Sequence, residues 1–118
     1  MNINYFVFGT NDMRKAVKFY DGIFESSGVN KVHDEGRMTL WSAGDFMFAL
    51  AEPFNGEAAT FGNGTMVGVN LDSAAEVERL HKKALALGGT DEGEPKIRSG
   101  RFSAYVRDLD NNKICFYQ

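Results

Sequence analysis

The chain has 118 residues, of which 43% are hydrophobic and 25% are charged, and its formal net charge is −3. This length and balance are typical of one globular domain with a sizeable core. The absence of a basic cluster argues against nucleic acid as the main partner. The N-terminus predicts neither a signal peptide nor a membrane partner. The single cysteine, Cys115, cannot form an internal disulfide.

The first half of the chain predicts a strand, an amphipathic helix and three further strands. Ile3 to Phe8 is a β-branched and aromatic run of strand length. Asn11 and Asp12 are typical N-cap residues, and apolar residues follow them at helical spacing up to Phe24. Three strand-like segments come next: Val29 to His33, Met38 to Ser42 and Asp45 to Ala51.

The second half predicts the same order of elements. Met66 to Leu71 is a strand, and Ser73 with Glu76 forms a capping box before a helix that stops at Gly88 and Gly89. The three strands that follow are Pro95 to Arg98, Phe102 to Arg107 and Lys113 to Tyr117, with a hairpin turn over residues 108–112.

The two halves align with each other as an internal repeat. Sliding the sequence along itself places Tyr5 on Met66, Asp12 on Ser73 and Gly28 on Gly89. We therefore predict a single α+β domain over residues 1–118, built from two βαβββ modules whose curved mixed sheets surround a cavity. The modules span residues 1–51 and 66–118, and the segment 52–65, rich in Gly and containing Pro, is the linker between them.

Strand alternation predicts which side chains face that cavity. Successive residues of a strand point to opposite faces of its sheet. We assign the bulkier set of each strand, such as Phe46 and Phe48, to the face under the helix. The opposite set then forms the predicted ligand pocket: Tyr5, Thr39, Trp41, Met47, Met66, Asn70, Arg101, Tyr105, Cys115 and Tyr117.

Two motifs and the internal repeat carry a family resemblance. The segment 9–20 begins Gly-Thr-Asn-Asp and ends Phe-Tyr, and it resembles the first strand–helix signature of the vicinal oxygen chelate superfamily. The segment 106–114, Val-Arg-Asp-Leu-Asp-Asn-Asn-Lys-Ile, resembles the closing hairpin of the same superfamily. The superfamily includes glyoxalases, extradiol dioxygenases, and the bleomycin and fosfomycin resistance proteins, and the resemblance extends over essentially the whole chain.

The resemblance implies where a metal site would lie. In metal-dependent members four side chains, one from each of four cavity strands, hold a divalent ion, and in typical glyoxalases they are His or Gln, Glu, His and Glu. The corresponding residues here are Tyr5, Met66, Cys115 and either Met47, by the repeat register, or Phe48, by its distance from Met66. Octahedral sites rely on carboxylate and imidazole ligands, so we expect no metal cofactor at these positions.

Histidine and cysteine chemistry is predicted to play a small part. His81 lies in the middle of a predicted helix, where we expect a solvated side chain, and His33 lies beside Asp34 and Glu35 in what we expect to be an exposed turn, although this trio could bind an ion. Cys115 would act as a nucleophile only if a neighbouring base or cation lowered its pKa. We favour a small buried side chain at that position.

These patterns favour a small-molecule-binding protein that acts without a metal. By its resemblance to the drug-sequestering resistance proteins, we expect a cytoplasmic, bacterial-type homodimer that binds an aromatic or amphipathic ligand in a cleft lined by both subunits, with Trp41 stacking on the ligand. The first alternative is a glyoxalase-like lyase, isomerase or dioxygenase with a relocated metal, or with Cys115 and Tyr5 acting directly. The second is a regulatory or interaction module whose cavity is filled by its own Met and Phe side chains.

Overall fold

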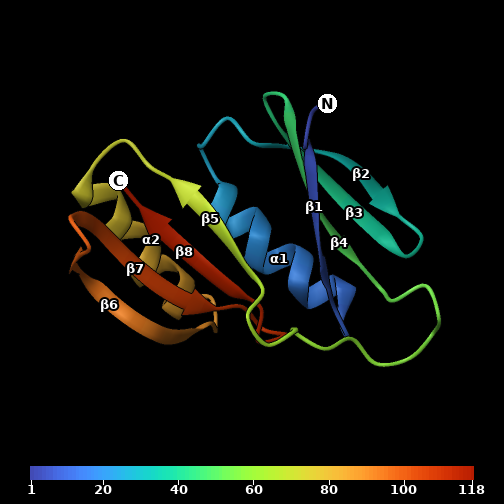
Figure 1. Ribbon diagram of the computed structural model, residues 1–118. Coiled ribbons are helices and arrows are strands. Elements are labelled where there is room, and N and C mark those ends of the chain that lie inside the picture. The colour runs from blue at the N-terminus through green and yellow to red at the C-terminus, as the bar shows by residue number, and fades with distance from the viewer.

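Each half of the chain folds as a strand, a helix and three strands, and the computed structural model describes all residues 1–118 (Figure 1). The elements of the first half are β1 (Tyr5–Gly9), α1 (Met13–Phe24), β2 (Asn30–Glu35), β3 (Met38–Ala43) and β4 (Phe46–Ala51). Those of the second half are β5 (Met66–Asn70), α2 (Ala74–Ala86), β6 (Thr90–Arg98), β7 (Arg101–Arg107) and β8 (Lys113–Tyr117). The predicted α+β class and the two βαβββ units are confirmed.

The two sheets have the same strand order. One is ordered β1-β4-β3-β2 and the other β5-β8-β7-β6. In each sheet the first strand of the module pairs in parallel with the last, and the remaining pairs are antiparallel. Strands β1 and β5 therefore lie at sheet edges, and each leaves one row of backbone groups without a strand partner.

Side-chain caps fix the start of both helices. The Asp12 carboxylate accepts a hydrogen bond from the Lys15 amide, and the Ser73 hydroxyl accepts one from the Glu76 amide at 3.2 Å. Only this half of the predicted capping box forms, because the Glu76 carboxylate binds Arg79 on the next turn of α2 instead. Neither helix is long and apolar enough to cross a membrane.

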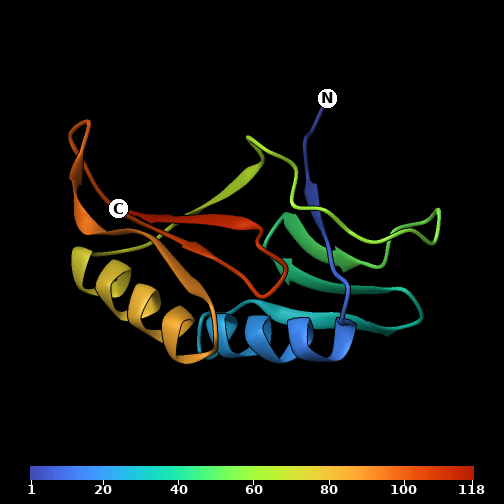
Figure 2. The same ribbon diagram turned by 90° about the horizontal axis from the view of Figure 1, so that it is seen from below.

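Both helices lie on the same side of the molecule, with the two sheets on the other side (Figure 2). A single apolar core fills the space between them and includes side chains from both modules, such as Phe19, Leu50, Val77 and Phe116. The opposite face of each sheet is not covered by a helix. We call these two surfaces the helix-free faces.

A polar contact inside the core joins the modules. The Tyr20 hydroxyl, on α1, donates a hydrogen bond of 2.6 Å to the carboxylate of Asp108, which begins the turn between β7 and β8. Asn112 donates to Asp108 and, at 3.1 Å, to the backbone carbonyl of Gly9 at the end of β1. The closing turn of the second module is thus held against the first strand and helix of the other module.

Candidate ligand-binding site

The helix-free face of the β5–β8 sheet carries most of the predicted pocket residues. Their neighbours along β7 and β8, including Val106, Ile114 and Phe116, lie in the core, so alternation directs the other set away from the helices. The structure places these predicted residues on the helix-free face of this sheet: Met66, Asn70, Arg101, Tyr105, Cys115 and Tyr117. Two more, Tyr5 and Met47, lie opposite each other on the corresponding face of the first sheet.

Four of these residues line one surface pocket. Its volume is about 430 Å³, and its lining residues come from β6, β7, β8 and the turn between β6 and β7: Arg98, Ser99, Arg101, Ser103, Tyr105, Cys115 and Tyr117. We call it the β7–β8 pocket. The predicted pocket did not include Arg98 and Ser99, because the segment before the turn has only a weak strand pattern. Ser103 was not listed in the pocket either, although the alternation that places Arg101 and Tyr105 on this face places Ser103 there too. In the structure, β6 starts five residues earlier, at Thr90, and its pairing register shifts twice.

Cations lie over the aromatic rings of this pocket. The guanidinium of Arg98 is 5.2 Å from the ring centre of Tyr105, and the Lys113 ammonium is 5.1 Å from the same ring. The guanidinium of Arg101 is 5.4 Å from the ring centre of Tyr117. Contacts of this length are attractive, because the ring face carries partial negative charge. The contacts therefore hold positive groups and flat apolar surfaces side by side.

Backbone carbonyls fix the position of Arg98. Its Nη1 donates to the carbonyl of Ser103 at 2.6 Å, and its Nη2 donates to the carbonyl of Glu94 at 2.8 Å. Both acceptors are neutral, so these bonds orient the guanidinium without cancelling its charge.

Cys115 is the thiol of this pocket, and it is free and buried. Burial raises the pKa of the thiol above its ordinary value. A hydrogen bond from Tyr105 and the charges of Arg98 and Lys113 act in the opposite direction but do not offset the burial. The thiol is therefore protonated at neutral pH, which disfavours a nucleophilic role.

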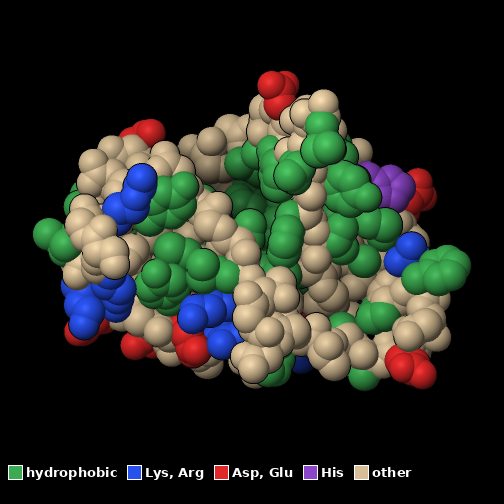
Figure 3. Space-filling view, in the orientation of Figure 1, with side chains coloured by type: hydrophobic (Ala, Val, Ile, Leu, Met, Phe, Trp, Pro, Cys, Tyr) green, Lys and Arg blue, Asp and Glu red, His purple; other side chains and the backbone are tan.

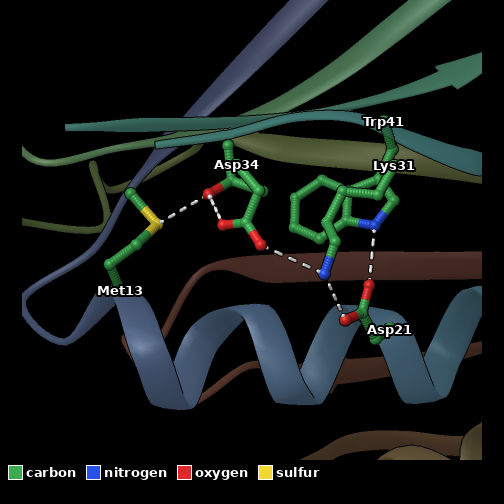
Figure 4. Close-up of polar contacts among 6 residues, drawn as sticks. Met13, Asp21, Lys31, Asp34 and Trp41 are labelled. Carbon is green, nitrogen blue, oxygen red and sulfur yellow. Dashed lines mark hydrogen bonds and ion pairs between the residues drawn. The ribbon is translucent and has the colours of Figure 1, made fainter. Parts of the chain in front are cut away.

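Trp41 does not face the helix-free side, and this part of the prediction is wrong. Its side chain is 1% exposed and packs against the rings of Tyr20, Phe24 and Phe48 in the core. The indole Nε1 donates a hydrogen bond of 3.0 Å to Asp21 on α1 (Figure 4). The large ring is buried under α1, where a carboxylate accepts its N–H. The side chains of β3 that were predicted to face the pocket therefore face the helix instead.

Thr39 lies on the same face of β3 as Trp41, so its predicted place in the pocket is also wrong. Its hydroxyl is buried between α1 and β2, 3.4 Å from the sulfur of Met13 and 3.3 Å from the Asp34 carboxylate. Lys31 then forms ion pairs with Asp34 and with Asp21, at 3.3 Å and 2.8 Å (Figure 4). These polar contacts tie β2 and β3 to α1 and serve the packing of the first module.

The strand register revises one of the positions that the resemblance assigns to a metal ligand. Cys115 lies opposite the third residue of β5, and in the first sheet the third residue of β1 lies opposite Ala49. Ala49 is therefore the structural counterpart of Cys115. Met47 instead corresponds to Lys113, and Phe48 is buried in the core.

The four positions do not fit a hard divalent ion. They hold the phenol of Tyr5, the thioether of Met66, the protonated thiol of Cys115 and the methyl group of Ala49. Ions such as Mg²⁺, Mn²⁺ and Fe²⁺ are held in proteins by carboxylate, carbonyl and imidazole groups. No three His, Cys, Asp or Glu side chains lie close enough together in the structure to hold a metal ion.

The histidines lie away from the pocket. The prediction of a solvated His81 is wrong, because its side chain is buried. Its Nε2 pairs with the Asp91 carboxylate at 2.9 Å. The neighbouring strand β6 supplies that partner, which the helical pattern alone could not reveal. His33 is exposed, and its Nε2 lies 3.1 Å from the carbonyl of Glu35.

A second hollow lies between the two sheets, where the sequence predicted a cavity, but none of the predicted pocket residues line it. Figure 3 shows hydrophobic side chains gathered along it in the middle of the helix-free side. It encloses about 160 Å³, and its apolar lining comes from both modules, with Phe24, Phe46 and Phe48 on one side and Val67, Val69 and Phe116 on the other. The two pockets thus contrast in character, since this groove is almost wholly apolar and the β7–β8 pocket is basic and hydroxylated.

Comparisons with known proteins agree with this architecture. A family model described as the Glyoxalase/Bleomycin resistance protein/Dioxygenase superfamily matches residues 2–116. No curated protein matches the chain.

Solved structures with the same fold include a glyoxalase/bleomycin resistance protein from Albidiferax ferrireducens T118. It is 32% identical, with a TM-score of 0.89 over 98% of this chain and 96% of that chain. A glyoxalase-related enzyme from Fulvimarina pelagi is 21% identical, with a TM-score of 0.83 over 98% and 86% of the two chains. A lactoylglutathione lyase from Agrobacterium tumefaciens is 22% identical, with a TM-score of 0.74 over 98% and 92%. The last two likenesses concern the fold alone.

Proposed function

Because the chain belongs to the Glyoxalase/Bleomycin resistance protein/Dioxygenase superfamily, we propose that it binds a small aromatic or amphipathic molecule on the helix-free side of its sheets, without a metal ion. The observation that carries this proposal is the β7–β8 pocket, where the rings of Tyr105 and Tyr117 border a space of about 430 Å³. A planar ligand stacked on such rings gains about 0.5–1.5 kcal/mol per ring beyond the burial of its area.

Two features favour binding over catalysis. The donor set at the positions of the family's metal site lacks carboxylate and imidazole groups, so it offers no suitable ligands for Lewis-acid chemistry by a hard ion. The thiol of Cys115 has a raised pKa, and no histidine lines its pocket to act as a general base. A lyase or dioxygenase would need groups that these positions do not hold. The free volume of the β7–β8 pocket likewise favours a binder over a module with a filled cavity.

The proposal includes a homodimer. The edge strands β1 and β5 expose apolar side chains on the helix-free side, among them Tyr5, Val7 and Met66, whose side chains are 66%, 38% and 44% exposed. A second copy that covered these edges would remove an aggregation hazard and deepen the ligand site. Sedimentation at micromolar concentration is expected to give the mass of a dimer, and Tyr5→Lys is expected to shift the population towards the monomer. A wild-type monomer at that concentration would contradict this part of the proposal.

The binding function is tested with a neutral fluorescent probe, 2-naphthamide, so that charge plays no part. We expect saturable binding that a metal chelator leaves unchanged. Tyr105→Leu removes one ring and is expected to weaken binding about fivefold, the equivalent of about 1 kcal/mol. Phe54→Leu is the matched control, because Phe54 is an exposed ring outside the β7–β8 pocket and is expected to leave the affinity unchanged. Loss of probe binding on chelation, or equal effects of the two variants, would contradict the proposal.

A cytoplasmic location is part of the same proposal. The only cysteine is a free thiol buried beside the pocket, an arrangement that persists most readily in a reducing compartment.

A further inference from the structure

The charge of the β7–β8 pocket is opposite to that of the whole protein. The chain has a net charge of −3, yet the pocket is lined by Arg98 and Arg101 and by no acidic residue. Lys113 adds a third cation, since its ammonium lies over the ring of Tyr105. In the view of the helix-free side, basic side chains lie over the β5–β8 half of the surface (Figure 3).

No carboxylate forms an ion pair with any of these three cations. None of the ion pairs in the structure includes Arg98, Arg101 or Lys113. Asp91 and Glu92 lie close enough to interact electrostatically with Arg98 and Lys113, but their ion pairs are with His81 and Arg107. The three cations therefore remain free to form an ion pair with a ligand.

Neutral hydrogen-bonding groups surround the same space. The hydroxyls of Ser99, Ser103, Tyr105 and Tyr117 line it together with the two guanidinium groups. Hydroxyls and guanidinium groups both donate to oxyanions, and a guanidinium matches the two oxygens of a carboxylate with its planar fork. The rings under the cations add flat apolar surface within the same volume.

We infer that the ligand of this pocket is an aromatic carboxylate, whose ring lies against Tyr105 and Tyr117 and whose carboxylate is held by Arg101 and Arg98. This inference rests on the proposed binding function and specifies the chemical class of ligand. Lys113 supplies additional positive potential beside the ring of Tyr105. The charge also explains why a net acidic protein would attract an anion to this particular surface.

The test compares two probes that share a ring system and differ in charge, 2-naphthoate and 2-naphthamide. With the wild-type protein at low salt, naphthoate is expected to bind at least tenfold more tightly than naphthamide, and added NaCl is expected to weaken naphthoate only. Arg101→Gln is expected to remove most of this preference, because it weakens naphthoate binding far more than naphthamide binding. Arg14→Gln is the control, because it removes the same charge from an exposed position on α1 and is expected to keep the preference.

The outcomes separate the two proposals. Equal affinity for the two probes would overturn the carboxylate inference and leave the binding function standing. Failure of both probes to bind would overturn the binding function and this inference with it. An unchanged preference in both Arg101→Gln and Arg98→Gln would show that these two arginines do not hold the carboxylate, and would overturn the inference.

Discussion

Two equivalent sheet faces of this molecule carry different side chains. Along β1 and β4 the helix-free face of the first sheet presents Tyr5, Val7 and Met47, which are apolar or aromatic. On the β5–β8 sheet the same side presents arginines, hydroxyls and a thiol around the β7–β8 pocket. The strand order is the same in both sheets, so the backbone plan does not decide the chemistry of either face. The chemistry of the β7–β8 pocket therefore depends on the side chains of the second module rather than on the strand order.

The largest expected effect compares two aromatic residues that the sequence analysis assigned to the same pocket, Trp41 and Tyr105. Trp41→Ala is expected to cost about 3–5 kcal/mol of unfolding free energy, because the indole is fully buried among aromatic rings and its N–H is paired with Asp21. Tyr105→Ala is expected to cost much less stability, because Tyr105 is only half-buried at a pocket wall. Urea unfolding midpoints of the two variants measure the difference. Similar losses in both would break the distinction between a packing face and a binding face.

The next effect concerns the contact that joins the modules. Tyr20→Phe removes the hydrogen bond to Asp108 and is expected to cost about 1–3 kcal/mol at neutral pH, because a buried carboxylate loses a donor. Burial raises the pKa of Asp108 above its ordinary value, while bonds from Tyr20 and Asn112 lower it and offset part of that rise.

The pH dependence of this variant follows from that raised pKa. A carboxyl group whose pKa is raised on folding contributes stability that is present below its unfolded pKa and is lost as the pH rises through the folded pKa. Losing the hydrogen bond from Tyr20 raises the pKa of Asp108 further. The unfolding free energy lost in Tyr20→Phe is therefore expected to shrink as the pH falls and Asp108 becomes protonated. Urea unfolding at several acidic and neutral pH values checks this. A cost that does not change with pH would indicate that Asp108 keeps one protonation state over the whole range.

The smallest effect is kinetic and concerns the pocket thiol. Because burial raises the pKa of Cys115, its reaction with iodoacetamide at neutral pH is expected to be slower than that of an unhindered cysteine. The rate is expected to increase with pH, with a midpoint above the ordinary cysteine value. A carboxylate probe that occupies the β7–β8 pocket is expected to slow the reaction further. Rapid alkylation at neutral pH would place an activated thiol on this face and favour the enzymatic alternative.

The strong sequence patterns predicted most of the fold. The apolar spacing along α1 and the alternation in β8 specify where those elements lie and which side of each is buried, and both predictions agree with the structure. The phase of β3 could not be predicted in the same way. Both of its faces carry apolar residues, and the choice depends on the distant Asp21, which accepts a hydrogen bond from Trp41.

The candidate site was predicted less completely for a related reason. Arg98 lies at the end of a strand, β6, whose charged and irregular sequence gives little alternation, and its position is set by carbonyls of Glu94 and Ser103. His81 likewise became interpretable only when β6 placed Asp91 beside it. These residues acquire their roles from tertiary contacts rather than from local spacing.

The closing turn of the second module has a consequence for how the chain could be divided. Asp110 accepts a hydrogen bond from the Asn11 amide, and Asn112 binds the carbonyl of Gly9, so the docking of the modules does not depend on the peptide connection after Thr60. Ala59 itself is bonded to Asn11 and belongs with the first module. A chain cut at Asn63, between two glycines, would therefore yield two fragments that carry complementary surfaces and can reassociate. In this respect the protein resembles a heterodimer of half-chains held on one polypeptide.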